Sequence, residues 1–295
     1  MKEFLKSHLP EGVVVAMAKA RRSFDGLIAR GASAAISALP LRVRVLVRER
    51  FSGIGTLDYP RHPIRLRVDS ETELGRLNAC RKEPETIEWI EGFVKPGDVV
   101  YDIGANVGAY SFVVDRVTSG TATVYAFEPS FSTYAQLSRN IALNQCAGRV
   151  IPLHIALSDA NGLVPFNYSS LQPGAALHAL GLVGELNGRG FIPEFTQPVP
   201  SYRLDDLIHA FRLKPPNHMK LDVDGIELRI LRGACRTLAD PSLRTVLVEV
   251  EPGKPEAVAA ERVLVEAGFA LRSRHPHGSG ENATANLVFT RIGER

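Results

Sequence analysis

The residues best suited to do chemistry stand in a short loop after a predicted buried strand, residues 99–103. The loop reads Asp102-Ile-Gly104-Ala-Asn106-Val-Gly108 and leads directly into a predicted helix. Gly104 permits a tight turn with positive φ, and Asn106 tolerates the same backbone region while adding a polar amide. Gly108 lets the chain run close to a ligand or to the sheet. Asp102 ends the strand, where its carboxylate can hold a cationic group or a ligand hydroxyl.

Glu128 ends the next predicted strand. An acidic residue at that place typically accepts hydrogen bonds from both ribose hydroxyls of an adenosine. A dehydrogenase would show Gly-x-Gly-x-x-Gly, whose backbone N–H groups approach a pyrophosphate. This loop has one glycine fewer, and Asp102 would repel a pyrophosphate. S-Adenosyl-L-methionine carries no phosphate and has a positively charged ammonium, so the loop and Glu128 together predict it as the cofactor.

Four motifs in this order resemble the FkbM family of methyltransferases. They are the loop from Asp102 to Gly108, Ala126-Phe-Glu-Pro129, Ala156-Leu-Ser-Asp159 and Lys220-Leu-Asp-Val-Asp-Gly-Ile-Glu227. The resemblance covers about residues 80–290. It implies a class I methyltransferase fold with a seven-stranded sheet and methyl transfer, usually to a hydroxyl oxygen of sugars, glycolipids or polyketides. The family usually has Asp-Val-Glu-Gly where this chain has Asp222-Val-Asp224-Gly225, so the carboxylate of Asp224 has a shorter reach.

Lys220 and Asp222 are the candidate catalytic residues. Side chains alternate along a strand, so these two share one face of the predicted strand at residues 218–223. An unpaired ammonium inside a central strand would be costly, and we therefore expect Lys220 to contact Asp222 or another carboxylate. We hypothesise that Asp222 orients an acceptor hydroxyl and accepts its proton, while Lys220 positions both. The alternative is an internal salt bridge that only shapes the strand end.

The remaining candidates are assigned with less support from the sequence. Asp159, helped by Ser158, follows the third predicted strand and could reach the adenine amino group. Four further residues are candidates for substrate binding, although Glu227, in the first turn of a helix, suits the helix dipole equally well: Asp224, Glu227, Glu249 and His178.

Three functions are compatible with these residues. The sequence favours an S-adenosylmethionine-dependent O-methyltransferase that acts on a carbohydrate, glycolipid or secondary metabolite. The alternatives are an NAD-dependent oxidoreductase and a non-catalytic cofactor-binding module. Asp222-Val-Asp224 also spells the Asp-x-Asp pattern of glycosyltransferases, but that pattern is short and often accidental.

Two carboxylates at a strand end can hold Mg²⁺, yet we expect no metal site. The three cysteines show no metal-ligand or disulfide spacing, which fits a reducing cytoplasm.

The elements that must position these residues alternate between strand and helix from residue 95 onwards. The predicted strands are 99–103, 123–127, 150–155, 218–223 and 245–250, with helices between them and an antiparallel closing pair at 269–272 and 286–290. This alternation predicts an α/β fold, a Rossmann-like, mostly parallel sheet covered on both faces. Residues 157–204 interrupt it with short strands at 163–168 and 195–199, and we expect this insertion to form a substrate lid at the carboxyl edge of the sheet.

Residues 1–80 precede the predicted methyltransferase domain, 81–295, as a basic α/β extension with short helices and a β-hairpin. Residues 1–67 carry thirteen Lys and Arg against five Asp and Glu, a net charge of +8, and the remainder carries 22 against 27, a net of −5.

The pattern of residues 41–47 predicts an edge strand that pairs with 64–68. Such a basic arm suits an anionic partner, for example the inner face of a membrane, or is a solvated face without a partner. No apolar run is long enough to span a bilayer, and no nucleic-acid-binding motif is present.

Overall fold

The structure, a computed structural model, describes residues 31–51, 53–181, 192–278 and 283–293. The chain divides into two compact units, residues 1–52 and 53–295. In the first unit, residues 31–37 are helical and α3 (Leu41–Arg50) begins directly after Pro40. The predicted edge strand at 41–47 is therefore wrong. Valine and arginine alternate there, but α3 buries none of its residues, and alternation specifies a strand only where one face is buried. The helices predicted within residues 1–30 lie outside the described residues.

The second unit opens with an antiparallel hairpin of β1 (Gly53–Thr56) and β2 (Arg65–Val68). The strand predicted at 64–68 thus forms, but it pairs with residues 53–56 and not with 41–47. Leu57, Ile64 and Leu66 are buried in the same core as the sheet. Two short helices follow, α4 (Glu71–Arg76) and α5 (Ala79–Lys82). Residues 53–80 consequently pack as part of the second unit, and the division between the units falls at residue 52.

The centre of the second unit is a seven-stranded sheet in the order β12-β13-β11-β10-β3-β4-β5. The five strands from β11 to β5 are parallel, and β13 runs antiparallel to both β11 and β12. This is the class I methyltransferase sheet that the sequence predicted, including its antiparallel closing pair. The strands are β3 (Val99–Ile103), β4 (Thr123–Phe127), β5 (Val150–Leu153), β10 (His218–Leu221), β11 (Thr245–Val250), β12 (Phe269–His277) and β13 (Thr284–Arg291).

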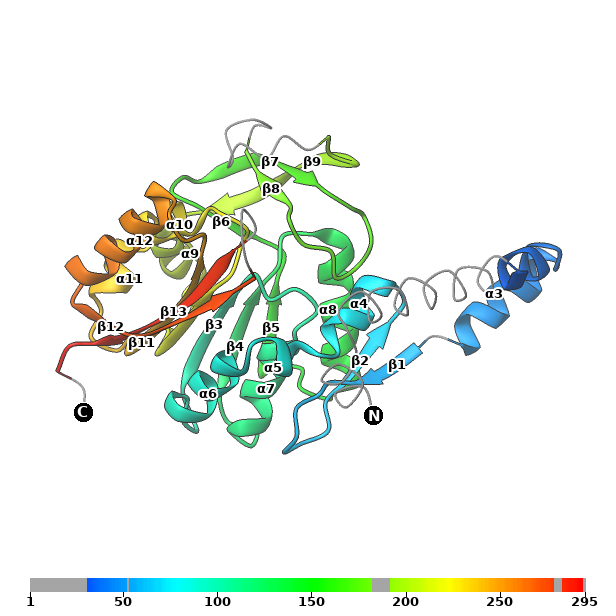
Figure 1. The fold of residues 1–295 in the computed structure, drawn as a ribbon, viewed down its shortest axis with the longest axis horizontal. Coiled ribbons are helices and arrows are strands. Elements are labelled where there is room, and N and C mark those ends of the chain that lie inside the picture. The colour runs from blue at the N-terminus through cyan, green and yellow to red at the C-terminus, as the bar shows by residue number, and fades with distance from the viewer. Residues whose placement is uncertain (1–30, 52, 182–191, 279–282, 294–295) are drawn as a thin grey trace, which may run out of the picture. The chain divides into compact units, whose positions relative to one another are not determined.

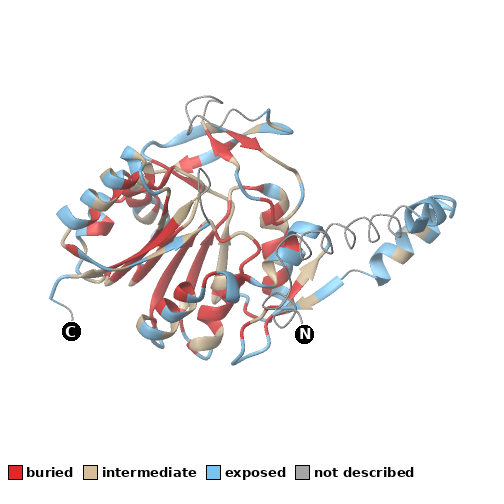
Figure 2. Ribbon diagram, in the orientation of Figure 1, coloured by how far each residue is buried: buried red, intermediate tan, exposed pale blue. Residues whose placement is uncertain are grey.

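Helices cover both faces of this sheet, as Figure 1 shows. Alternate residues of β3 point to opposite sides: Tyr101 belongs to one apolar core and Val100 to the other. Figure 2 shows the buried residues along the strands between these layers. The face of Val100 packs against α6 (Pro84–Phe93), α7 (Ala109–Val117) and α8 (Phe131–Leu143). The face of Tyr101 packs against α9 (Leu204–Phe211), α10 (Glu227–Arg232), α11 (Cys235–Ala239) and α12 (Pro255–Glu266).

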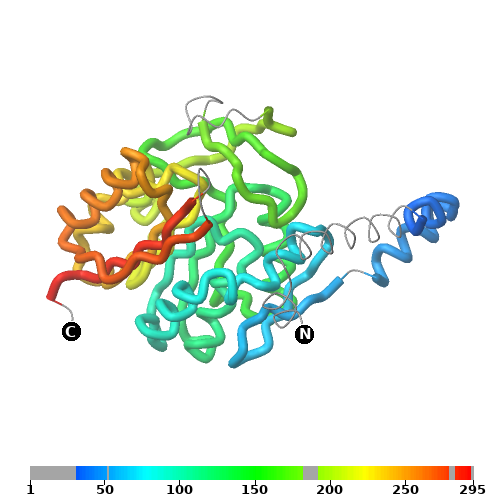
Figure 3. Tube along the Cα trace, in the orientation of Figure 1, coloured from blue at the N-terminus to red at the C-terminus, as the bar shows by residue number. Residues whose placement is uncertain are grey.

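The insertion between β5 and β10 forms a second sheet in the order β6-β9-β7-β8. Its strands are β6 (Ala156–Leu157), β7 (Gly162–Tyr168), β8 (Ala179–Leu180) and β9 (Phe195–Tyr202). Both strands predicted within the insertion are therefore present. Figure 3 shows this part of the trace, in green to yellow-green, above the ends of the central strands. Among the described residues, no helix is long and apolar enough to cross a membrane.

Candidate active site

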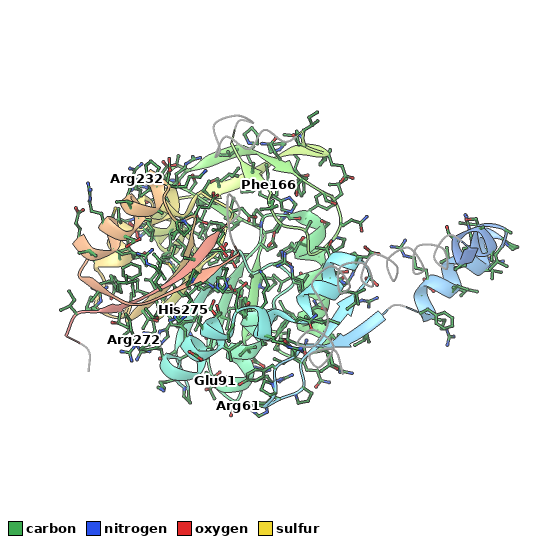
Figure 4. All side chains as sticks on the ribbon, in the orientation of Figure 1. Arg61, Glu91, Phe166, Arg232, Arg272 and His275 are labelled. Carbon is green, nitrogen blue, oxygen red and sulfur yellow. The ribbon has the colours of Figure 1, made fainter. Side chains whose placement is uncertain are left out.

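A cavity of about 720 Å³ lies where the insertion meets the carboxyl ends of β3, β4 and β10. That volume is within the roughly 300–1,000 Å³ that is typical of small-molecule sites. The insertion contributes Leu157, Phe166 and Leu180 to its wall, and Phe166 is labelled in Figure 4. The central sheet contributes the loop after β3, Glu128 after β4, and Lys220 and Asp222 on and after β10. The cavity therefore lies at the edge of the sheet where parallel α/β folds bind their ligands.

The loop after β3 runs close to the strand beside it. Gly104 has φ +84°, and a Cβ atom there would collide with the carbonyl oxygen of Asp222. Asn106 also has positive φ, +50°. Gly108 has φ +93°, but a Cβ atom at this position would meet Leu137 and Phe112, not the cavity. Gly104 thus allows the close approach of two strand ends, and Gly108 allows α7 and α8 to pack.

The backbone N–H groups of this loop already have acceptors inside the protein. Asn106 N donates to Glu128 Oε2 at 3.0 Å, Val107 N to Asn106 Oδ1 at 2.9 Å, and Gly108 N to Ala105 O at 2.9 Å. A dinucleotide site needs such groups free to approach a pyrophosphate. The arrangement of this loop therefore disfavours the NAD-dependent alternative.

Glu128 is held at the cavity wall by two backbone donors. Oε2 accepts the bond from Asn106 N, and Oε1 accepts one from Ser130 N at 2.8 Å. Burial raises the pKa of Glu128 to about 7, although these hydrogen bonds oppose the shift. Each carboxylate oxygen has a second lone pair, so Glu128 keeps the capacity to accept hydrogen bonds from a ligand.

Asp102 lies beneath the cavity and is not part of its wall. Its side chain is buried, and Oδ2 accepts a hydrogen bond of 2.6 Å from Ser111 Oγ. Oδ1 is buried and has no partner among the described residues. Burial raises the pKa of Asp102, while the charge of Lys220 opposes that shift. The structure thus leaves Asp102 outside the cavity wall, beside Lys220 on the neighbouring strand, and the contact with the cofactor stays a prediction.

Lys220 and Asp222 form the ion pair that the sequence predicted. Lys220 Nζ lies 2.7 Å from Asp222 Oδ2 and 4.9 Å from the centre of the Tyr110 ring. The Lys220 side chain is 3% exposed and that of Asp222 is 29% exposed. Burial alone would favour a neutral amine, but the carboxylates of Asp222 and Asp102 hold the pKa of Lys220 above its ordinary value. Burial likewise works against the Asp222 carboxylate, yet the ammonium keeps its pKa below the usual range.

Asp224 and Glu227 shape the turn after β10. Asp224, with φ +58°, accepts a hydrogen bond of 2.7 Å at Oδ2 from Leu177 N of the insertion. Glu227 Oε1 accepts bonds from Val223 N and Gly225 N. Burial raises the pKa of Glu227 to about 7. Asp224 lines the cavity, whereas Glu227 does not. Glu227 therefore stabilises the turn through its hydrogen bonds to the backbone and is not part of the cavity wall.

Glu249 is the last residue but one of β11 and lines the cavity. Its Oε1 accepts a hydrogen bond of 3.0 Å from Thr284 Oγ1. Burial, followed by the charge of Asp222, raises the pKa of Glu249 to about 8. Glu249 can therefore carry a proton near neutral pH, beside the ionised Asp222.

His178 also lines the cavity, but Ser158 and Asp159 do not. His178 Nδ1 accepts a hydrogen bond of 3.2 Å from Ser169 N, and burial lowers the pKa of the imidazole to about 4. Asp159 forms an ion pair of 2.9 Å with Arg229 and accepts a hydrogen bond from Ser158 Oγ. The structure thus places His178 in the cavity wall. Ser158 and Asp159 lie outside the wall, where the ion pair with Arg229 holds Asp159 at α10.

Sequence reasoning missed four residues of the cavity wall, three of which precede β3 in the chain. Arg76, Lys82, Glu83 and Tyr110 all line the cavity. The first three come from α4, α5 and the turn before α6, which carry no recognisable motif. The one available signal was the position of Tyr110, two residues after the loop and on the first turn of α7.

Comparison with known proteins adds independent findings. The methyltransferase FkbM domain matches residues 102–271. The hexuronic acid methyltransferase AglP of Haloferax volcanii is 29% identical over 64% of this chain and 71% of its own length. The 31-O-demethyl-FK506 methyltransferase FkbM of Streptomyces tacrolimicus is 32% identical over 53% of this chain and 66% of its own.

Among solved structures, the methyltransferase FkbM from Methylobacillus flagellatus aligns with a TM-score of 0.47 at 14% identity. That alignment covers 75% of this chain and 56% of the solved chain, so this protein spans little more than half the length of that relative. The matched FkbM domain itself covers more than half of this chain, from the end of β3 through the insertion and β10. The chain belongs to the FkbM family of methyltransferases.

Proposed function

We propose that this protein is an S-adenosyl-L-methionine-dependent O-methyltransferase that acts on a hydroxyl group of a carbohydrate, glycolipid or secondary metabolite. The observation that carries the cofactor assignment is the Glu128 carboxylate. It lines the cavity at the end of β4 and is oriented by Asn106 N and Ser130 N. Hydrogen bonds to two adjacent ribose hydroxyls suit a carboxylate fixed in this way.

The residues at the cavity fit the rest of such a cofactor. Pro129, Ile155 and Leu157 offer apolar contacts beside Glu128, as a nucleobase requires. The loop after β3 offers no free N–H groups for a pyrophosphate, so an adenosine ligand without phosphate is favoured. When bound, this cofactor supplies an activated methyl group for in-line transfer to an acceptor oxygen.

Asp222 and Lys220 act on the acceptor hydroxyl group. The Asp222 carboxylate, ionised at neutral pH beside the Lys220 ammonium, orients the acceptor hydroxyl and takes up its proton as the methyl group is transferred. The ammonium holds Asp222 in place through the 2.7 Å contact. Because Asp102 lies beneath Lys220 and is buried, it holds the lysine charged without touching a substrate.

The relatives support the choice of acceptor class. One is named for a hexuronic acid and the other for 31-O-demethyl-FK506. Both names indicate an acceptor that carries oxygen functional groups. Thr284, His277 and Glu249 line the cavity and provide polar groups for such a molecule.

Calorimetric titration tests the cofactor assignment. We expect S-adenosylhomocysteine to bind, and NAD to show no binding at the same concentration. Glu128→Gln keeps the shape and loses the charge, so its affinity for S-adenosylhomocysteine should fall about tenfold or more, since hydrogen bonds to a charged group contribute roughly 1.5–3 kcal/mol. Binding of NAD in preference to S-adenosylhomocysteine would refute the assignment, and an unchanged affinity of the Glu128→Gln variant would refute the role of this carboxylate.

A further inference from the structure

Among the residues that the structure describes, Arg76 is a cation of the cavity wall that has no acid partner. Three Lys and Arg side chains line the cavity: Arg76, Lys82 and Lys220. Lys82 lies 3.1 Å from Glu83, and Lys220 lies 2.7 Å from Asp222. In the described part of the chain, Arg76 forms no ion pair with any carboxylate. A half-buried charge of this kind is stabilised when a ligand supplies the opposite charge.

The orientation of Arg76 is fixed by the insertion. Its Nε and Nη2 atoms both donate to the carbonyl oxygen of Gly174, at 3.1 and 2.9 Å. Gly174 N in turn donates to Thr133 Oγ1, and Ser70 Oγ donates to Pro173 O. These bonds connect the segment between β7 and β8 to α4 and α8, which lie side by side in Figure 1. The guanidinium is therefore held in position before any ligand arrives, which lowers the entropic cost of binding.

Part of the guanidinium is left for a ligand. An arginine side chain has five N–H donors in a planar fork. Two of the donors are used by Gly174 O, and the structure gives the others no acceptor among the described residues. Donors arranged in this way match the two oxygens of a carboxylate.

Arg76 shares the cavity wall with residues of both functional parts of the site. Glu128, assigned to the cofactor, and Asp222, assigned to the acceptor, line the same cavity. The charge of Arg76 works to lower the pKa of both carboxyl groups and of the His178 imidazole. A ligand group bound by Arg76 would therefore lie in the same cavity as the nucleoside and the acceptor hydroxyl.

We propose that Arg76 binds a carboxylate group of the ligand. This inference rests on the proposed function, because that reaction offers two sources of the group: the amino-acid arm of the cofactor, and the acid group of a uronate acceptor. In either case Arg76 is a binding residue that selects its ligand by charge, and it makes no contact with the transferred methyl group.

The test compares ligands that differ only in the carboxylate-bearing arm. S-Adenosylhomocysteine and 5′-methylthioadenosine share the nucleoside and the sulfur, but only the first has the amino-acid arm. For Arg76→Met we expect a roughly ten- to hundredfold weaker affinity for S-adenosylhomocysteine, as expected for loss of a charge-assisted hydrogen bond. The affinity for 5′-methylthioadenosine should stay within about twofold. Arg76→Lys should fall between, because it keeps the charge and loses the fork.

A second titration tests the other possible source of the carboxylate, the acid group of a uronate acceptor. If both nucleosides bind Arg76→Met as they bind the wild type, we expect glucuronic acid, titrated in the presence of S-adenosylhomocysteine, to lose its preference over glucose. Arg232→Met is the matched control: this arginine is exposed on α10, away from the cavity, and is labelled in Figure 4. It should leave every affinity unchanged.

Two results would overturn the proposal. Equal losses for S-adenosylhomocysteine and 5′-methylthioadenosine would show that Arg76 only anchors the insertion at Gly174. No change for either nucleoside or for glucuronic acid would show that it binds no carboxylate. A wild-type protein that binds neither nucleoside would instead refute the proposed function itself.

Discussion

Replacement of Lys220 by methionine should destabilise the protein strongly. Lys220 is 2% exposed within β10, and its ammonium is shared between Asp222, 2.7 Å away, and the buried Asp102 on the neighbouring strand. Methionine has a similar volume, so Lys220→Met removes the charge and leaves little cavity. Two carboxylates would then stay at the strand ends without a cation.

The expected loss in the free energy of unfolding is about 3–5 kcal/mol near neutral pH, the usual cost of removing one partner of a buried ion pair. The loss should depend on pH. Without Lys220, the burial that raises the pKa of Asp102 is opposed only by the hydrogen bonds from Ser111, so that pKa should rise further. A folded-state pKa above the unfolded value means that stability is lost as pH rises. The difference between wild type and variant should therefore be larger at about pH 8 than at about pH 5.

Urea denaturation at both pH values measures these quantities. Lys214→Met is the control, because Lys214 is exposed and its side chain forms no ion pair with the described residues. Adding Asp222→Asn to Lys220→Met removes one orphaned charge, and we expect it to restore about 1–3 kcal/mol. A loss below about 1 kcal/mol, or one that is the same at both pH values, would contradict this account of the buried pair.

Three further predictions concern the sheet and the cavity. His218 is buried against Asp98, and burial lowers the pKa of its imidazole from 6.5 to about 4. The free energy of unfolding should therefore fall by up to about 3 kcal/mol as the pH is lowered from about 6.5 to 4. His218→Gln should make this fall smaller. Gly104→Ala should abolish cofactor binding and lower the melting temperature, because a Cβ atom there collides with the carbonyl oxygen of Asp222. Burial raises the pKa of Glu249 to about 8, so the wild type must ionise a buried acid as pH rises, and Glu249→Gln should gain stability relative to it at about pH 9.

Each of these has a clear contrary outcome. An acid melting curve that His218→Gln leaves unaltered would place the titration elsewhere. Normal binding of S-adenosylhomocysteine by Gly104→Ala would mean that the two strand ends can separate at no cost. A Glu249→Gln variant whose stability relative to the wild type is the same at acid and alkaline pH would show that burial does not shift the pKa of Glu249.

The central sheet could be predicted because its strands are buried on both faces. Residues 99–103, 123–127 and 245–250 are observed as strands with the predicted bounds. Their continuous apolar runs are bounded by turn residues, which is the clearest pattern a sequence offers. Residues 41–47 lacked any such constraint. Their alternation fits an edge strand, but no partner strand selects it, and the residues form a helix.

Most of the candidates that reach the cavity wall stand where a motif marks the end of a strand; His178, in the insertion, is an exception. Glu128, Lys220 and Asp222 lie together at one cavity, because β4 and β10 are parallel strands on either side of β3 whose carboxyl ends meet at the same edge of the sheet. Arg76 could not be found in this way, because it reaches the cavity through the packing of α4 against the insertion. Asp159 stands in a family-like motif, yet the ion pair with Arg229 holds it outside the cavity wall.

The most direct test of the central claim is the transfer of an isotopically labelled methyl group from S-adenosylmethionine to an acceptor. Wild-type protein and Asp222→Asn would each be incubated with pooled carbohydrates and glycolipids, and the products examined by mass spectrometry. We predict that the wild type adds one labelled methyl group to a hydroxyl oxygen, and that Asp222→Asn loses this activity while still binding S-adenosylhomocysteine. A label on nitrogen or carbon, or equal turnover by both proteins, would contradict the account.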